Sequence, residues 1–243
     1  MPYFEITTKQ RLAVLRSREK GYFDLEFIKA LPEAARPDAL NALNASRAQL
    51  RQDLLALALN GFKSGGFFVE FGATNGVELS NSWLLENEYG WQGILAEPAQ
   101  AWHADLKRNR NCTIETKCVW IKSGETLKFT EAPRGENSGI SAFVPTRRQM
   151  RGHSYGVETI SLNDLLETHN APGVIDYMSV DTEGSEFDIL NAFDFDRWQM
   201  RLLTIEHNFA PQRDDIFKLL TSKGYRRIMQ EQSRFDDWYV KDI

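Results

Sequence analysis

The chain has 243 residues, of which 42% are hydrophobic and 26% charged, a composition typical of an ordinary soluble globular protein with one main domain. Its formal net charge is −5 and its basic residues are spread along the chain, so it lacks the basic footprint of nucleic-acid binders. The only cysteines, Cys112 and Cys118, are too few for a disulfide framework; we expect two partly buried free thiols and a cytoplasmic location.

Residues 1–60 contain no strand-like run and carry leucines at helix-compatible spacing, interrupted upstream by Pro32 and Pro37. We therefore expect an N-terminal helical extension over 1–60. The start of the chain has no apolar run long enough for a signal peptide or a membrane span, so no membrane span is expected. The helices could cover a cleft or form a homodimer contact, and their pattern selects neither role.

Residues 61–243 have a different pattern, in which short apolar runs alternate with amphipathic segments. The runs are GFFVEFG, GWQGILAEP, IDYMSVD and RLLTIEH. This alternation is typical of parallel strands separated by helices, and it predicts one doubly wound α/β domain. A helix is expected over 212–223. The two close runs after Gly224 must pair antiparallel, because a parallel return needs a long crossover.

The first apolar run ends in an acid and a small-residue turn, from Phe67 to Gly76. Gly72 and Gly76 let a ligand approach the backbone, and Glu70 places a carboxylate at the carboxyl edge of the sheet, where such sheets bind ligands. Thr74 stands where the dinucleotide-binding motif has its second glycine, which disfavours a nicotinamide cofactor. A carboxylate at this edge suits a cofactor that carries an ammonium group instead.

The second run ends in Glu97, close to the interval at which an acid reaches a ribose in nucleotide-binding α/β units. A carboxylate can accept hydrogen bonds from both ribose hydroxyls. Glu70 and Glu97 together predict an adenosine-containing cofactor.

Several segments are similar to those of one family: Gln52-Asp53, GFFVEFGATNG, SNSWLLE, GWQGILAEP, SLNDLL at 161–166 and YMSVDTEGSE at 177–186. From about Gln52 to its end, the chain resembles the FkbM-type methyltransferases. The resemblance implies S-adenosyl-L-methionine as cofactor and a Rossmann-like class I fold, with a seven-stranded, mostly parallel sheet whose last strand is antiparallel. Glu70 replaces the aspartate that is common in the family. The implied cofactor site comprises Gln52, Glu70, Phe71, Gly72, Ala73, Asn75, Gly76, Glu97, Pro98, Cys118, Val119 and Asp181.

Asp181 ends the predicted fourth core strand and is the expected catalytic base. An ordinary carboxylate is a weak base for an alcohol, so either burial raises its pKa or a divalent cation such as Mg²⁺ assists, held by Asp181 and Glu206. Glu183 is a catalytic candidate or a charge that complements a helix dipole, and for Glu186 the second role is favoured. His207, which follows Glu206, is an alternative base.

A polar stretch over 133–141, followed by Arg147, Arg148, Arg151 and His153, suits a hydroxyl-rich or phosphate-bearing acceptor, or is a solvated hairpin. The expected function is O-methylation of a hydroxyl on a sugar, glycan or other small molecule. The alternatives are a nicotinamide-dependent oxidoreductase and a non-catalytic cofactor-binding module. The acids at the cleft disfavour the second alternative.

Overall fold

The computed structural model describes residues 8–133 and 135–243. The first seven residues of the predicted helical extension and Arg134 of the polar stretch lie outside this description, as do the side chains of residues 8–10 and Arg148. The helices are α1 (Thr8–Ala30), α2 (Arg36–Ala42), α3 (Gln52–Leu59), α4 (Trp83–Tyr89), α5 (His103–Asn109), α6 (Thr146–Gln149), α7 (Leu162–Thr168), α8 (Glu186–Asn191), α9 (Arg213–Ser222) and α10 (Gln230–Ser233), with short 3₁₀ turns at Glu33–Ala35, Gln100–Trp102 and Gly135–Asn137.

The strands form two sheets. They are β1 (Phe67–Phe71), β2 (Gln92–Ala96), β3 (Thr113–Glu115), β4 (Cys118–Trp120), β5 (Thr126–Glu131), β6 (Gly139–Ile140), β7 (His153–Ser161), β8 (Val174–Val180), β9 (Gln199–Glu206), β10 (Arg226–Ile228) and β11 (Asp236–Val240). The main sheet has seven strands in the order β10-β11-β9-β8-β1-β2-β3, and β11 runs antiparallel to both of its neighbours. The predicted seven-stranded, mostly parallel Rossmann-like sheet with an antiparallel last strand is confirmed.

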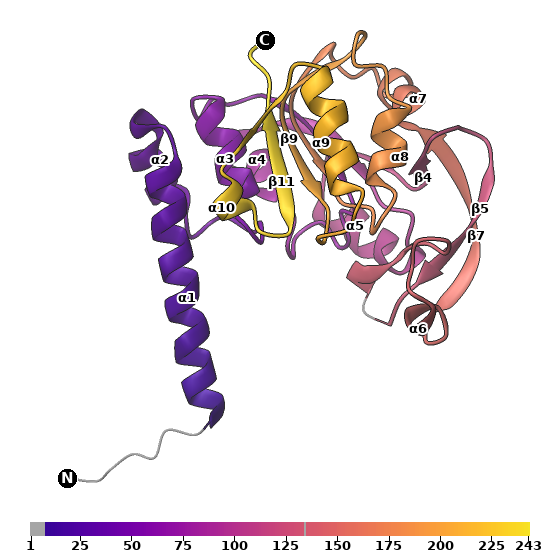
Figure 1. Ribbon diagram of the computed structural model, residues 1–243, viewed down its shortest axis with the longest axis horizontal. Coiled ribbons are helices and arrows are strands. Elements are labelled where there is room, and N and C mark those ends of the chain that lie inside the picture. Colours follow the sequence, from indigo (N-terminus) through magenta and orange to yellow (C-terminus); the bar gives the residue numbers. More distant parts are fainter. Residues whose placement is uncertain (1–7, 134) are drawn as a thin grey trace.

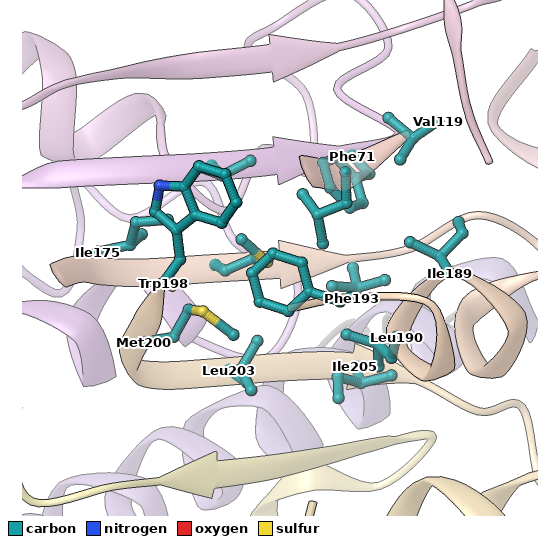
Figure 2. Packing of buried hydrophobic residues seen from close by; sticks show 14 of the residues in the cluster. Phe71, Val119, Ile175, Ile189, Leu190, Phe193, Trp198, Met200, Leu203 and Ile205 are labelled. Atoms are coloured by element: carbon teal, nitrogen blue, oxygen red, sulfur yellow. The ribbon is translucent and has the colours of Figure 1, made fainter. Parts of the chain in front are cut away.

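The main sheet is apolar on both faces, which explains the continuous apolar runs in its strands. Successive residues of a strand point to opposite faces, so Phe68 and Val69 of β1 belong to different core clusters. Figure 2 shows one cluster, in which Ile205 of β9 lies beside Leu190 of α8. The other face packs against α3, α4 and part of α1.

Helix α3 packs against the main sheet. Leu54, Leu55 and Leu57 are fully buried in the same cluster as Phe68 and Trp238. This helix therefore contributes to the core of the α/β unit, although the sequence placed it in the extension. The division into an extension over 1–60 and a domain over 61–243 stays a prediction.

Helix α1 leaves the body of the molecule and projects away from the sheet (Figure 1). Its carboxyl-terminal half is anchored by buried Phe23 and Phe27 and by an ion pair between Asp24 and Arg51. Its exposed side includes Tyr22, which is 68% exposed. No helix in the described part of the chain combines the length and apolar character needed to cross a membrane.

The second sheet has the order β4-β7-β5-β6 and was not predicted. The strand β5 alternates polar and apolar residues and is half buried, so it lacks the continuous apolar run by which the other strands were recognised. Part of the polar stretch expected over 133–141 forms the turn and β6 strand of this sheet. Strands β5 and β7 pair antiparallel from Thr126 to Glu131.

Candidate active site

A cavity of about 690 Å³ opens at the carboxyl edge of the main sheet. It lies where β1, β2, β8 and β9 end and where the antiparallel β11 begins. Of the residues predicted for the site, those that line the cavity are Gln52, Glu70, Phe71, Gly72, Glu97, Pro98, Cys118, Val119, Asp181, Glu183, Glu206 and His207. Ala73, Asn75 and Gly76 do not line it.

The turn after β1 depends on its glycines. Gly72 has a φ of +74°, and a Cβ there would lie 2.5 Å from the carbonyl oxygen of Asp181. Only glycine therefore lets the turn pass the end of β8 at this distance. The side-chain oxygen of Asn75 accepts hydrogen bonds from the backbone amides of Val77 and Glu78, both at 2.9 Å. Asn75 thus shapes the turn and does not face the cavity.

Glu70 is almost fully buried, and its carboxylate is used within the protein. It accepts hydrogen bonds from the Ser80 hydroxyl at 3.1 Å, the Asn81 backbone amide at 2.8 Å and the Ser82 hydroxyl. These contacts hold the segment before α4 against the end of β1. The structure thus shows Glu70 as an organiser of this segment, and its predicted contact with a cofactor amine stays a prediction.

Glu97 follows β2, and backbone amides hold both of its carboxylate oxygens. Oε2 accepts from Thr74 at 2.7 Å and Oε1 accepts from Ala99 at 2.8 Å. Burial, with smaller contributions from the charges of Glu131 and Glu70, raises the pKa of Glu97 to about 7, although the amide hydrogen bonds act in the opposite direction. Each oxygen keeps a second lone pair, which can accept a hydrogen bond from a ligand in the cavity.

Asp181 directly follows β8 and Glu206 ends the neighbouring strand β9, and their side chains share a hydrogen bond. A hydrogen bond between two carboxyl groups needs a proton on one of them. Burial and the charge of Glu206 raise the pKa of Asp181, while burial and then the charge of Glu183 raise the pKa of Glu206 to about 7. The two groups therefore hold one proton between them near neutral pH.

Asp236 is a cavity residue that the sequence reasoning missed. It begins β11 and lies directly opposite Glu206 in the strand pairing. Gln52 donates a hydrogen bond from Nε2 to its Oδ2 at 2.9 Å. Burial raises the pKa of Asp236 to about 6. The antiparallel tail was the signal that could have found it, because the first residue of an antiparallel strand lies at the edge where its parallel neighbours end.

His207 lines the cavity, but its ring is buried and hydrogen-bonded to the backbone. Its Nδ1 accepts a hydrogen bond from the Phe209 backbone amide at 2.9 Å, so in the neutral ring the proton is on Nε2. Nε2 lies 3.7 Å from Asp237, too far for a hydrogen bond. Burial lowers the pKa of His207, which keeps the ring neutral. This geometry favours a structural role over the predicted role as a base.

Glu183 and Glu186 follow β8 and differ in their use. Oε1 of Glu186 accepts hydrogen bonds from the backbone amides of Thr182 and Gly184, and its Oε2 accepts from Gln212. Glu186 thus holds the loop before α8 in place, which agrees with the structural role favoured for it. Glu183 lines the cavity with a φ of +60°, and its catalytic role stays a prediction.

The second sheet provides one wall of the cavity, from Gly135 to Pro145. Its turn packs on the motif after β8, since a Cβ on Gly184 would lie 3.0 Å from Cβ of Phe143. Phe143 in turn packs against Trp120, with ring centroids 5.9 Å apart. Arg147 and Arg151 are exposed and do not line the cavity.

Within residues 8–133 and 135–243, no three acids, histidines or cysteines are grouped so that they could hold a metal ion. The predicted magnesium ligands Asp181 and Glu206 lie within hydrogen-bond reach of each other, and a role for Mg²⁺ stays a prediction. Cys118 and Cys112 are free thiols, as predicted, and burial raises the pKa of Cys118 to about 12.

A profile of the methyltransferase FkbM domain matches residues 70–227. The chain belongs to the FkbM methyltransferase family. The match spans the turn after β1, the second sheet and both Asp181 and Glu206. By family and fold, the protein is an S-adenosylmethionine-dependent methyltransferase. No curated protein matches the sequence closely enough to count as a relative.

Three solved structures are similar to this chain at low sequence identity. A precorrin-6y C5,15-methyltransferase from Geobacter metallireducens is 13% identical, with a TM-score of 0.43 over 78% of this chain and 87% of that one. A human methyltransferase 10 domain containing protein is 10% identical, with a TM-score of 0.40 over 79% and 81%. A point mutant of MtNAS is 14% identical, with a TM-score of 0.40 over 96% and 76%.

Proposed function

We propose that this FkbM-family protein transfers the methyl group of S-adenosyl-L-methionine to a hydroxyl oxygen of a sugar, glycan or other small molecule. The observation that carries the proposal is the hydrogen-bonded Asp181–Glu206 pair, which stands in the same cavity as Glu97 and the Gly72 turn. The cavity of about 690 Å³ has the size of a small-molecule site.

The residues around β1 and β2 fit the cofactor. Glu97 is oriented by two amides and can accept from ribose hydroxyls, while Gly72 keeps the backbone close to the end of β8. The bound cofactor supplies an electrophilic methyl group on a sulfonium. The protein's part is to hold the acceptor hydroxyl in line with that group and to take its proton.

The Asp181–Glu206 pair is suited to take this proton. A carboxylate with an ordinary pKa near 4 is a poor base for an alcohol, whereas burial and the charges of neighbouring carboxylates raise the pKa of both Asp181 and Glu206. With the cofactor bound, the C–O bond would form as the bond between the methyl carbon and sulfur breaks, which would leave S-adenosylhomocysteine. The proton of the hydroxyl would pass to a carboxylate oxygen of the pair and later leave to solvent. Base catalysis of this kind contributes roughly 10²–10⁴-fold in rate.

The two alternatives make different predictions for ligand binding. Melting of the protein with S-adenosylhomocysteine at a hundred times its dissociation constant should show about 2.7 kcal/mol of added stability, which raises Tm by roughly 5–10 °C. NAD should have no effect. A rise with NAD alone would favour the oxidoreductase. A rise with S-adenosylhomocysteine but no methyl transfer to any acceptor would favour the non-catalytic module.

Two further expectations remain part of this proposal. Action in the cytoplasm is predicted from the sequence, and dimer formation through the N-terminal helices is one of the two roles that their pattern leaves open. Size measurement by light scattering tests the second, and a monomer at micromolar concentration contradicts it.

A further inference from the structure

Asp236 is a buried carboxylate with one oxygen held and the other available to a ligand. The residue is 5% exposed and lines the cavity. Its Oδ2 accepts hydrogen bonds from Gln52 at 2.9 Å and from the Trp238 indole at 3.4 Å. No described residue donates a hydrogen bond to its Oδ1. The two contacts fix the orientation of the carboxylate, so Oδ1 is preorganised for a donor from the cavity.

The surroundings of Asp236 carry no compensating positive charge. Its partner across the strand pair is Glu206, which shares a proton with Asp181. Among the described residues that line the cavity, none is lysine or arginine. A hydroxyl would satisfy the free oxygen but leave the charge uncompensated, whereas an ammonium group would satisfy both.

The geometry points to a protonated amine of the acceptor as the group that Asp236 binds. This inference rests on the proposed methyl transfer and names its substrate class: a small polyol that carries an amine as well as the reacting hydroxyl, as amino sugars do. Neighbouring strands lie about 4.8 Å apart, so an amine at Asp236 and a hydroxyl at the Asp181–Glu206 pair fit on one sugar-sized molecule. Phosphate-bearing acceptors are repelled by the same carboxylates.

The test uses S-adenosylmethionine with a deuterated methyl group. A small-molecule extract of the source organism is separated by ion exchange at pH 7.5 into cationic, neutral and anionic fractions. Each fraction is incubated with the full-length enzyme in the presence of a chelator, so that no divalent cation takes the place of the amine. The labelled product should arise from the cationic fraction.

Two variants connect that result to Asp236. Asp236→Asn keeps an acceptor for Gln52 but removes the charge, and it should lower labelling of the cationic acceptor at least tenfold. Asp237→Asn is the matched control on the same strand, because Asp237 pairs with Arg213 and Arg227 outside the cavity and should keep the preference for the cationic fraction. Stabilisation by S-adenosylhomocysteine shows that each variant is folded.

Labelling confined to the neutral or anionic fraction overturns the inference while leaving methyl transfer intact. Full labelling of a cationic acceptor by folded Asp236→Asn also overturns it. Absence of label from every fraction is a different result, because it contradicts the methyl transfer on which the inference rests. The wild-type comparison decides the substrate class even where the Asp236→Asn variant does not fold.

Discussion

Glu97 is held by two backbone amides and offers its remaining lone pairs to the cofactor ribose. Glu97→Gln removes the charge and one acceptor. The dissociation constant for S-adenosylhomocysteine should therefore rise about 10–100-fold, or ~1.5–3 kcal/mol, measured by titration calorimetry. Glu115→Gln is the control, since Glu115 ends the adjacent strand β3 outside the cavity and should leave the affinity unchanged. Equal affinity of wild type and Glu97→Gln removes Glu97 from the cofactor site.

Single residues at the cavity were predictable where they end a parallel strand. Glu97, Asp181 and Glu206 were found in this way, because parallel strands direct their carboxyl ends to one edge. Asp236 escaped this reasoning because it starts an antiparallel strand. The hydrogen bonds that Ser80 and Ser82 donate to Glu70 were not predicted either. Such bonds depend on the backbone geometry of the turn, which the spacing of residues in the sequence does not reveal.

At the scale of elements, the turn after β1 and the end of β8 form one unit through Gly72. Gly72→Ala would place a Cβ 2.5 Å from the Asp181 carbonyl oxygen and would also force a φ of +74° on alanine. Stability should fall by ~2–4 kcal/mol in chemical denaturation, and cofactor affinity should fall with it. Gly124→Ala is the matched control, because its φ is +78° with nothing within 4 Å. A loss no larger than that of the control contradicts the steric account.

The elements of the main sheet were predictable and those of the second sheet were not. Buried parallel strands such as β8 are continuous apolar runs, whereas β5 alternates and β6 has only two residues. The helix α3 was predicted as a helix, but its contacts with the sheet depend on residues nearly two hundred positions away, such as Trp238. The hydrophobic pattern of a sequence indicates local structure better than it indicates such long-range packing.

For the whole molecule, buried carboxylates link stability to pH. Burial raises the pKa of Asp53 and Asp236 to about 6 and of Glu97 and Glu206 to about 7. Between pH ~4.5 and 7 the folded state thus binds more protons than the unfolded chain, so stability falls as pH rises. The Tm without ligand should be lower at pH 8 than at pH 5.5, by a shift on the order of 5 °C.

Carboxylates with a lowered pKa do not change the expected fall in stability between pH ~4.5 and 7. The pKa of Glu86 is lowered, chiefly by Arg110 against the opposing effect of burial, and that of Asp237 is lowered by Arg213 and Arg227. Protonation of these two carboxylates lowers stability only below about pH 4. Asp53 lies outside the cavity, and the substitution Asp53→Asn should reduce the change in Tm between pH 5.5 and pH 8. A Tm that rises from pH 5.5 to pH 8 contradicts the assignment of buried, proton-binding carboxylates.

The central claim is that the Asp181–Glu206 pair takes the proton of the acceptor hydroxyl. Its most direct test is the rate of labelled methyl transfer against pH, for wild type and for Glu206→Gln. In the wild type, kcat should rise with pH and level off above about pH 7–8, as the pair changes from holding two protons to holding one. In Glu206→Gln that rise should disappear and kcat should fall about 100-fold, with S-adenosylhomocysteine affinity nearly unchanged. A wild-type rate independent of pH, or a variant as fast as wild type, contradicts the account.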